Sequence, residues 1–226
     1  MKIAVTKLEE KSEGISELFL RYGHEAIIVS TMRSAEPSDP RPLFELCNLI
    51  SNDKIDILIF TSSLGVERLF KIILPRKNVR IVSVGPKTAR KVKDSGMKSE
   101  VIEKFSSDSF AGYLGDVKGK TIGIARAEVP NPELTGSLIS KGAIIIDAPA
   151  YRLESTGKNI VDVLNDVEAV IFTSAKSFEL SGFKPEHARN LKVLAIGQKT
   201  ADTLRDCGLS LYGVGKGTLE SCLVLV

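Results

Sequence analysis

The chain has 226 residues, which fits one large domain or two of about 110 residues, and its composition is ordinary for a soluble globular protein. A net charge of +3, with no basic stripe interleaved with aromatic residues, excludes nucleic-acid binding by bulk electrostatics. No apolar run approaches the roughly 20 residues of a membrane span and no signal-peptide pattern opens the chain, so we expect a cytoplasmic protein without membrane contact. The cysteines lie far apart at no metal-binding spacing and are expected to be reduced structural thiols: Cys47, Cys207 and Cys222.

Short apolar runs, each typical of a buried strand, alternate along the chain with helical patterns. The runs are Ile3–Val5, Ala26–Val29, Ile55–Phe60, Val79–Val84, Thr121–Ala125, Ala143–Ile146, Ala169–Phe172 and Val193–Ile196. Alternation of strand and helix favours parallel sheets built from βαβ units. Eight such strands in a chain of this length predict two sheets of four or five strands.

The two halves of the chain repeat one another. Two stretches recur at an offset of 112 residues, 56–62 in 168–174 and 82–89 in 194–201. The front of each half matches at an offset of 119 residues, 3–9 in 122–128. The change of offset predicts a connector of different length in the middle of each half. We expect two related α/β halves that face each other across a ligand-binding cleft.

Two segments are candidate hinges. Residues 33–42 hold three prolines, which argue against a helix or a central strand there, and 147–153 are the corresponding stretch of the second half. A chain that crosses at both hinges has spatial domains that differ from its sequence halves. The expected domains are 1–33 with 153–226, and 38–148, with linkers at 34–37 and 149–152.

A Gly-x-x-Thr-Ala sequence opens a helix after a strand in each half. A helix N-terminus offers free N–H groups and a partial positive charge, which attract carboxylate or phosphate. The alternative is that these residues only make a tight turn and a cap. Neither a P-loop nor a dinucleotide-binding glycine pattern is present. The candidate anion-binding residues are Gly85, Lys87 and Thr88 in the first copy, and Gly197, Lys199 and Thr200 in the second.

Hydroxyl side chains follow two of the predicted buried strands. In open parallel sheets ligands bind beyond the carboxyl ends of the strands, so these hydroxyls are candidates for ligand contact. Helix capping by serine needs the same residues, and both roles are compatible. The candidates are Thr61, Ser62 and Ser63 in the first half, and Thr173 and Ser174 in the second.

Three further residues have positions that suggest a role. Arg126 and Glu128 follow a strand, although an arginine near a glutamate is more often a surface pair than a site. Tyr151 lies in the second hinge, where a phenol could donate a proton, or could simply pack against a neighbouring domain. His24 and His187 are isolated and are expected at the surface, and no metal site is visible.

An ordered set of motifs over almost the whole chain resembles the uroporphyrinogen-III synthase family of tetrapyrrole biosynthesis. The motifs are Phe60-Thr61-Ser62 with Val66 and Phe70, Val84-Gly85-Pro86-Lys87-Thr88-Ala89, Lys118-Gly119-Lys120 leading to Arg126, Ala150-Tyr151-Arg152, Ile171-Phe172-Thr173-Ser174, Ala195-Ile196-Gly197-Gln198-Lys199-Thr200-Ala201 with Gly208, and Thr218-Leu219-Glu220-Ser221.

The resemblance implies two flavodoxin-like, doubly wound parallel-sheet domains joined by a two-stranded linker. It implies a lyase that cyclises hydroxymethylbilane to uroporphyrinogen III, with loss of water and inversion of the last pyrrole, and that uses no cofactor or metal. The substrate carries eight carboxylates, which the strand-end hydroxyls, helix N-termini and basic residues above would hold. Tyr151 is the candidate catalytic residue, assisting departure of the hydroxyl. We expect a monomer whose partner is this small molecule alone.

Two other functions fit the same residues. A two-domain binding or sensor protein could close on an anionic small molecule without chemistry. A sugar-nucleotide transferase with two doubly wound domains would normally need more length and an acidic or glycine-rich phosphate motif, which the sequence lacks. Separation of the type I and type III isomers formed from hydroxymethylbilane distinguishes the synthase from both.

Overall fold

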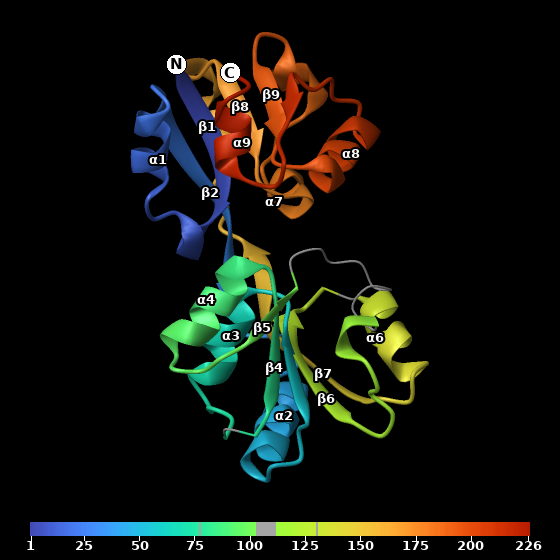
Figure 1. Cartoon of the computed structure of the whole chain (residues 1–226). Coiled ribbons are helices and arrows are strands. Elements are labelled where there is room, and N and C mark those ends of the chain that lie inside the picture. Colours follow the sequence, from blue (N-terminus) through green and yellow to red (C-terminus); the bar gives the residue numbers. More distant parts are fainter. Residues whose placement is uncertain (77, 103–111, 130) are drawn as a thin grey trace. The chain divides into compact units, whose positions relative to one another are not determined.

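The computed structural model describes residues 1–76, 78–102, 112–129 and 131–226, and its chain divides into two compact units (Figure 1). Unit 1 comprises Met1–Ser34 and Glu154–Val226, and unit 2 comprises Ala35–Leu153. The domain limits expected from the sequence stay predictions, and so does the ligand-binding cleft expected between the two halves.

Unit 1 is built on a parallel sheet with the strand order β10-β9-β8-β1-β2. Its strands are β1 (Lys2–Leu8), β2 (Glu25–Ala35), β8 (Ala169–Phe172), β9 (Lys192–Ala195) and β10 (Gly213–Val214). Its helices are α1 (Ile15–Arg21), α7 (Ala175–Glu179), α8 (Gln198–Asp206) and α9 (Leu219–Leu223), with 3-10 turns η1 (Glu9–Lys11), η2 (Ile160–Asp166) and η3 (Pro185–Ala188).

Unit 2 has the parallel order β7-β6-β3-β4-β5. Its strands are β3 (Ile57–Phe60), β4 (Arg80–Val84), β5 (Glu100–Ile102), β6 (Thr121–Ala127) and β7 (Ile144–Ser155). Its helices include α2 (Arg41–Ser51), α3 (Ser63–Phe70), α4 (Pro86–Asp94) and α6 (Pro132–Ile139). Unit 1 has the flavodoxin-like order 2-1-3-4-5, and unit 2 is a circular permutation of it. The predicted fold class is confirmed.

The repeat found in the sequence is a repeat in the structure. Ile57 pairs with Arg80 across β3 and β4, and the residues 112 positions later, Ala169 and Lys192, pair across β8 and β9. All eight predicted strands are present, while the short strands β5 and β10 were not predicted. The connector of unequal length holds the 11-residue helix α2 in the first copy and the 7-residue turn η2 in the second.

The two candidate hinge segments have more regular local structure than the sequence indicated. Strand β2 runs on to Ala35, and α2 begins at Arg41 with Pro42 in its first turn, where a missing N–H costs nothing. Residues 147–153 all lie within β7. Pro149 is tolerated there because it stands opposite Arg126, at the point where the β6–β7 register shifts.

Apolar side chains cover both faces of each sheet, as expected for buried parallel strands. In unit 1, α1 and α9 pack on one face around Phe19, while α7, α8 and η2 pack on the other around Phe172. In unit 2, α6 covers the face that carries Ile122 and Ile124, and α3 and α4 lie side by side on the opposite face (Figure 1). Each fully buried Ile, Leu or Phe contributes about 1.5–3 kcal/mol. No helix in the described ranges is long and apolar enough to cross a membrane.

Candidate functional site

The serines that follow β3 and β8 cap the helices behind them. Ser62 Oγ accepts the Gly65 N–H at 3.1 Å at the start of α3, and Ser174 Oγ accepts the Ser177 N–H at 3.0 Å at the start of α7. The predicted capping role is confirmed in both copies. Each cap leaves a hydroxyl at the carboxyl end of a central strand, where open parallel sheets bind ligands.

Tyr151 is brought to Ser62 by the packing of β7 in unit 2. Its side chain is 5% exposed, and its hydroxyl donates to Ser62 Oγ at 3.0 Å. Ser62 Oγ therefore accepts from both Tyr151 and the Gly65 N–H, and keeps its own proton for a further acceptor. A phenol, a serine hydroxyl and a helix N-terminus meet at this point.

The matching threonines Thr61 and Thr173 differ in what they bind. Thr173 Oγ1 donates to the Thr6 carbonyl at 2.7 Å, and its N–H donates to Thr6 Oγ1 at 3.2 Å. No hydrogen bond joins the Thr61 hydroxyl to another residue in the part of the chain that the structure describes. Thr61 is half-buried at a strand end, and its hydroxyl proton is not used by a described residue, whereas the Thr173 proton is.

A buried hydroxyl cluster in unit 1 was not found by sequence reasoning. Three residues, Thr6, Thr31 and Ser177, are fully buried. Thr6 Oγ1 lies 2.9 Å from Ser177 Oγ, and Thr31 Oγ1 donates to the Ser177 carbonyl at 3.2 Å. The repeat offsets place Ala125, Ala150 and Gly65 at the corresponding positions of unit 2. The sequence signal that could have revealed the cluster is this difference between the copies. One copy has hydroxyl side chains at all three positions, and the other has none.

The two glycine-led helix starts also differ. Gly85 has φ 77° and ψ 158°, a conformation essentially confined to glycine, while Gly197 has φ −170°, which any residue adopts. Lys87 and Lys199 are exposed, but Thr88 and Thr200 are only 5% and 6% exposed. The turn interpretation therefore accounts for Gly85, and the lysines are the residues that face solvent.

We expect Gly85→Ala to lower the free energy of unfolding by about 1–3 kcal/mol, because alanine is strained at that φ and ψ. Gly197→Ala is the matched control and is expected within about 0.5 kcal/mol of wild type, since the nearest atom to its new Cβ lies 3.6 Å away. Urea unfolding followed by circular dichroism measures both. Equal losses in the two variants would contradict the assignment.

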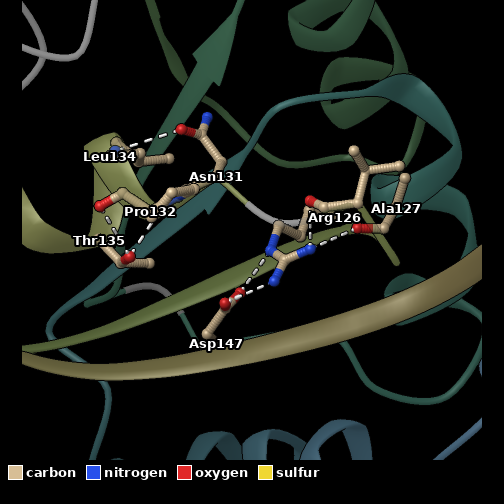
Figure 2. Close-up of polar contacts among 8 residues, drawn as sticks. Arg126, Ala127, Asn131, Pro132, Leu134, Thr135 and Asp147 are labelled. Carbon is tan, nitrogen blue, oxygen red and sulfur yellow. Dashed lines mark hydrogen bonds and ion pairs between the residues drawn. The ribbon is translucent and has the colours of Figure 1, made fainter.

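Arg126 is paired with Asp147 on the neighbouring strand, not with Glu128. Nε and Nη2 of Arg126 each donate to one Asp147 carboxylate oxygen at 2.6 Å, and Nη1 donates to the carbonyls of Ala127 and Val129 at 2.7 and 2.6 Å (Figure 2). Four of the five guanidinium N–H groups are thus used within the protein. The chain then enters α6, which Asn131 caps through the Leu134 N–H at 3.2 Å.

Glu128 and the histidines have partners or surroundings that the sequence did not indicate. Glu128 Oε2 accepts the Ser38 N–H at 2.8 Å. His24 is half-buried, and its buried Nδ1 has no hydrogen-bond partner among the described residues. His187 Nδ1 accepts the Lys184 N–H at 3.0 Å and its ring stacks edge-on against Phe183. Both histidines are half-buried, not fully exposed at the surface as expected. Ser63, the remaining candidate, is half-buried as the first residue of α3.

Two of the three cysteines are buried thiols. Burial raises the pKa of Cys222 to about 11 and also raises that of Cys47, because the thiolate is poorly solvated there. Both are therefore uncharged and unreactive near neutral pH. Over the residues that the structure describes, no group of three or more His, Cys, Asp or Glu side chains is arranged to hold a metal ion.

Comparison with known proteins gives one consistent family. The family described as Uroporphyrinogen-III synthase HemD matches residues 13–221. A Methanothermobacter thermautotrophicus protein, whose name assigns it provisionally as a uroporphyrinogen-III synthase, is 29% identical over 98% of this chain and 95% of its own length. The Synechococcus elongatus uroporphyrinogen-III synthase is 26% identical over 99% of this chain and 88% of its own.

Solved structures support the same fold. A mutant uroporphyrinogen III synthase from Thermus thermophilus is 21% identical with a TM-score of 0.67, covering 99% of this chain and 96% of that one. The Helicobacter pylori enzyme is 19% identical with a TM-score of 0.63, covering 100% and 98%. The family match spans nearly the whole chain and includes every candidate residue described above. The chain therefore belongs to the uroporphyrinogen-III synthase family.

Proposed function

We propose that this protein is a uroporphyrinogen-III synthase, a lyase that closes hydroxymethylbilane into uroporphyrinogen III with loss of water and inversion of the last pyrrole. The observation that carries the proposal within the structure is the contact between Tyr151 and Ser62 beside the unpaired Thr61 hydroxyl. Family membership favours this function over a non-catalytic sensor for the same kind of anion.

Polar groups at the carboxyl ends of the strands would hold the carboxylates of the substrate. A carboxylate at the start of α4 would receive free backbone N–H groups and the positive end of the helix, with Lys87 alongside. Thr61 and Ser62 each have a hydroxyl proton to donate. The full proposed binding set is Thr61, Ser62, Ser63, Gly85, Lys87, Thr88, Arg126, Glu128, Thr173, Ser174, Gly197, Lys199 and Thr200.

Tyr151 is proposed to assist the departure of the hydroxyl through Ser62. Breaking the C–O bond requires a proton on the leaving oxygen; Ser62 would supply it and take the Tyr151 proton along the 3.0 Å hydrogen bond. The substituted carbon of the last pyrrole ring would attack the azafulvene cation that remains, which gives a spiro intermediate. This intermediate would fragment, and the macrocycle would close with the last pyrrole inverted. Rearomatisation releases a proton, which returns to Tyr151 by the same path. The larger task is to hold the substrate so that inversion outpaces direct closure.

The proposal is tested by incubating the protein with enzymatically generated hydroxymethylbilane and separating the isomers formed. We expect type III product. Type I alone, as in a reaction without the protein, would overturn the proposed function. Binding of the substrate without any turnover would favour the sensor.

Tyr151→Phe is expected to lower kcat about 10²-fold, the usual contribution of one proton-transfer group, while leaving the fold intact. The control is Tyr22→Phe, at a tyrosine that is 39% exposed and outside the site. Initial rates of type III formation measure both variants. Unchanged turnover in Tyr151→Phe would remove this residue from the mechanism.

We further propose that the enzyme works as a monomer in the cytoplasm. Its free thiols fit a reducing compartment. Sedimentation of the purified protein tests the monomer, and cell fractionation tests the location.

A further inference from the structure

A row of unpaired cations runs along the exposed side of α4. Lys87, Arg90 and Lys93 follow one another at three-residue spacing, which places them on adjoining turns of the helix surface. Lys98 follows a few residues after the helix, and all four side chains are exposed. No carboxylate among the described residues forms an ion pair with any of them. These four residues are called the α4 ridge.

The ridge adds little to the stability of the helix that carries it. Lys87 stands in the first turn, beside the positive end of the helix, and like charges three residues apart repel one another. The neighbouring Lys91 shows the contrast, because its ammonium pairs with Glu67 of α3 at 3.3 Å. Lys91 helps to join two helices, whereas the ridge forms no ion pair with a described residue and favours its helix only through Lys93 in the last turn.

The second copy of this helix, α8, keeps cations at two of the four positions, Lys199 and Arg205, but has none at the other two. Both helices have nine residues and follow a glycine at the same offset. Asp202 occupies the place of Arg90, and it pairs with Arg205 at 3.3 Å and accepts from Gln198 at 2.6 Å. Ser210 occupies the place of Lys98. In α8, unlike the ridge, the charges are largely balanced within the helix.

A groove borders the ridge at the carboxyl end of α4. It has a volume of about 910 Å3, and its lining combines three cations, Arg90, Lys93 and Lys98, and one carboxylate, Asp94, with the apolar Met97. Cationic and apolar groups side by side match a molecule that carries carboxylates on apolar rings. From Lys93 the ridge runs about 9 Å along the helix axis to Lys87, at the helix start proposed to bind carboxylate.

We propose that the α4 ridge captures the tetrapyrrole polycarboxylate and guides it along α4 to the strand ends of unit 2. This inference rests on the proposed function for the identity of its ligand. Charge complementarity favours it: a polycarboxylate is the ligand for which several adjacent cations give the largest gain in association rate. An acidic segment of another protein is the alternative occupant, and the experiment below separates the two.

The test compares a triple variant, Arg90→Gln, Lys93→Gln and Lys98→Gln, with a control that loses the same charge elsewhere. The control replaces Lys54, Lys184 and Arg189, which are exposed and outside the ridge and the proposed site, with glutamine. The probe is uroporphyrin, the oxidised octacarboxylate product, whose binding is followed by its fluorescence. Association rate and Kd are measured at about 0.01 M salt, where charges act over about 30 Å, and at about 1 M, where they act over about 3 Å.

We expect the ridge variant to associate about tenfold more slowly than wild type at low salt, with the difference lost at high salt. Its melting temperature should stay near that of wild type, because the repulsion that is lost offsets the lost interaction of Lys93 with the carboxyl end of α4. A porphyrin with half as many carboxylates should show a smaller effect. An unchanged association rate, as expected for a site that binds an acidic protein instead, or an equal fall in the control variant, would overturn the inference. These measurements need no turnover, so failure of the ridge and failure of the synthase activity are distinguishable.

Discussion

Replacing Arg126 with methionine is expected to lower the free energy of unfolding of the protein by about 2–3 kcal/mol. The substitution keeps the length of the aliphatic stem but removes two charge-assisted bonds to Asp147 and two bonds to backbone carbonyls. The Arg126 side chain is 12% exposed and that of Asp147 is 31% exposed. The remaining carboxylate therefore regains some solvent, which keeps the loss below the full cost of breaking a buried pair.

The control for this prediction is Arg189→Met, at an exposed arginine with no ion-pair partner among the described residues, which should stay within about 0.5 kcal/mol of wild type. Urea unfolding followed by circular dichroism suits the protein, which has no tryptophan. The double variant with Asp147→Asn should lose less than the sum of the single changes, because the two residues share one interaction.

The same variants separate two roles for Arg126. If Arg126 binds the substrate, Arg126→Met should lower the affinity for substrate. Asp147→Asn should affect that affinity less, because it leaves the positive charge of Arg126 in place. If Arg126 instead positions the segment between β6 and α6, both variants should have a lower free energy of unfolding. A loss of affinity in Arg126→Met with wild-type stability would contradict the structural role drawn from Figure 2.

The architecture was predictable because it depends on local signals that the chain repeats. Buried parallel strands such as Ile57–Phe60 are continuous apolar runs, and the serines behind them cap helices by a rule that needs no distant partner. The duplicated offsets located the same signals twice. The local structure of the two hinge segments was not fully predicted, because a first helical turn tolerates Pro42, and an edge position with a register shift tolerates Pro149.

The partners of the site residues could not be predicted, because each depends on register across strands that are distant in the chain. The Tyr151 hydroxyl reaches Ser62, 89 residues away, only after β7 has paired with β6. Asp147 was overlooked for the same reason: Glu128 is nearer to Arg126 in sequence, but the strand pairing brings Asp147 to the guanidinium. The duplicated sequence also gave no sign of the difference between Thr61 and Thr173, whose hydroxyl donates to the backbone carbonyl of Thr6.

Gly65→Ala is expected to lower the free energy of unfolding by about 1–3 kcal/mol, although alanine is the better helix former by about 1 kcal/mol. A Cβ at Gly65 would stand 2.7 Å from the Ala125 carbonyl oxygen and 3.2 Å from its carbon. Both are backbone atoms of β6 and cannot move aside as a flexible side chain would. The start of α3 must therefore shift away from the sheet.

The control is Gly136→Ala in α6, where no atom lies within 4 Å of the new Cβ, and it should gain up to about 1 kcal/mol. Opposite signs in the two variants, measured by urea unfolding, are the expected result. Equal gains would show that α3 does not contact β6 as closely as the structure has it.

Gly65→Ala should also reduce turnover, because it moves Ser62 relative to Tyr151. In unit 1 the corresponding residue is Ser177, whose hydroxyl lies 2.9 Å from that of Thr6, so a pair of side chains lies between α7 and β1 there. In unit 2 the close approach of α3 brings the Ser62 cap to the phenol instead. If Tyr151 acts through Ser62, Tyr151→Phe should cost much less in the Gly65→Ala background than in wild type. A full additive loss would mean that Tyr151 acts on the substrate without Ser62.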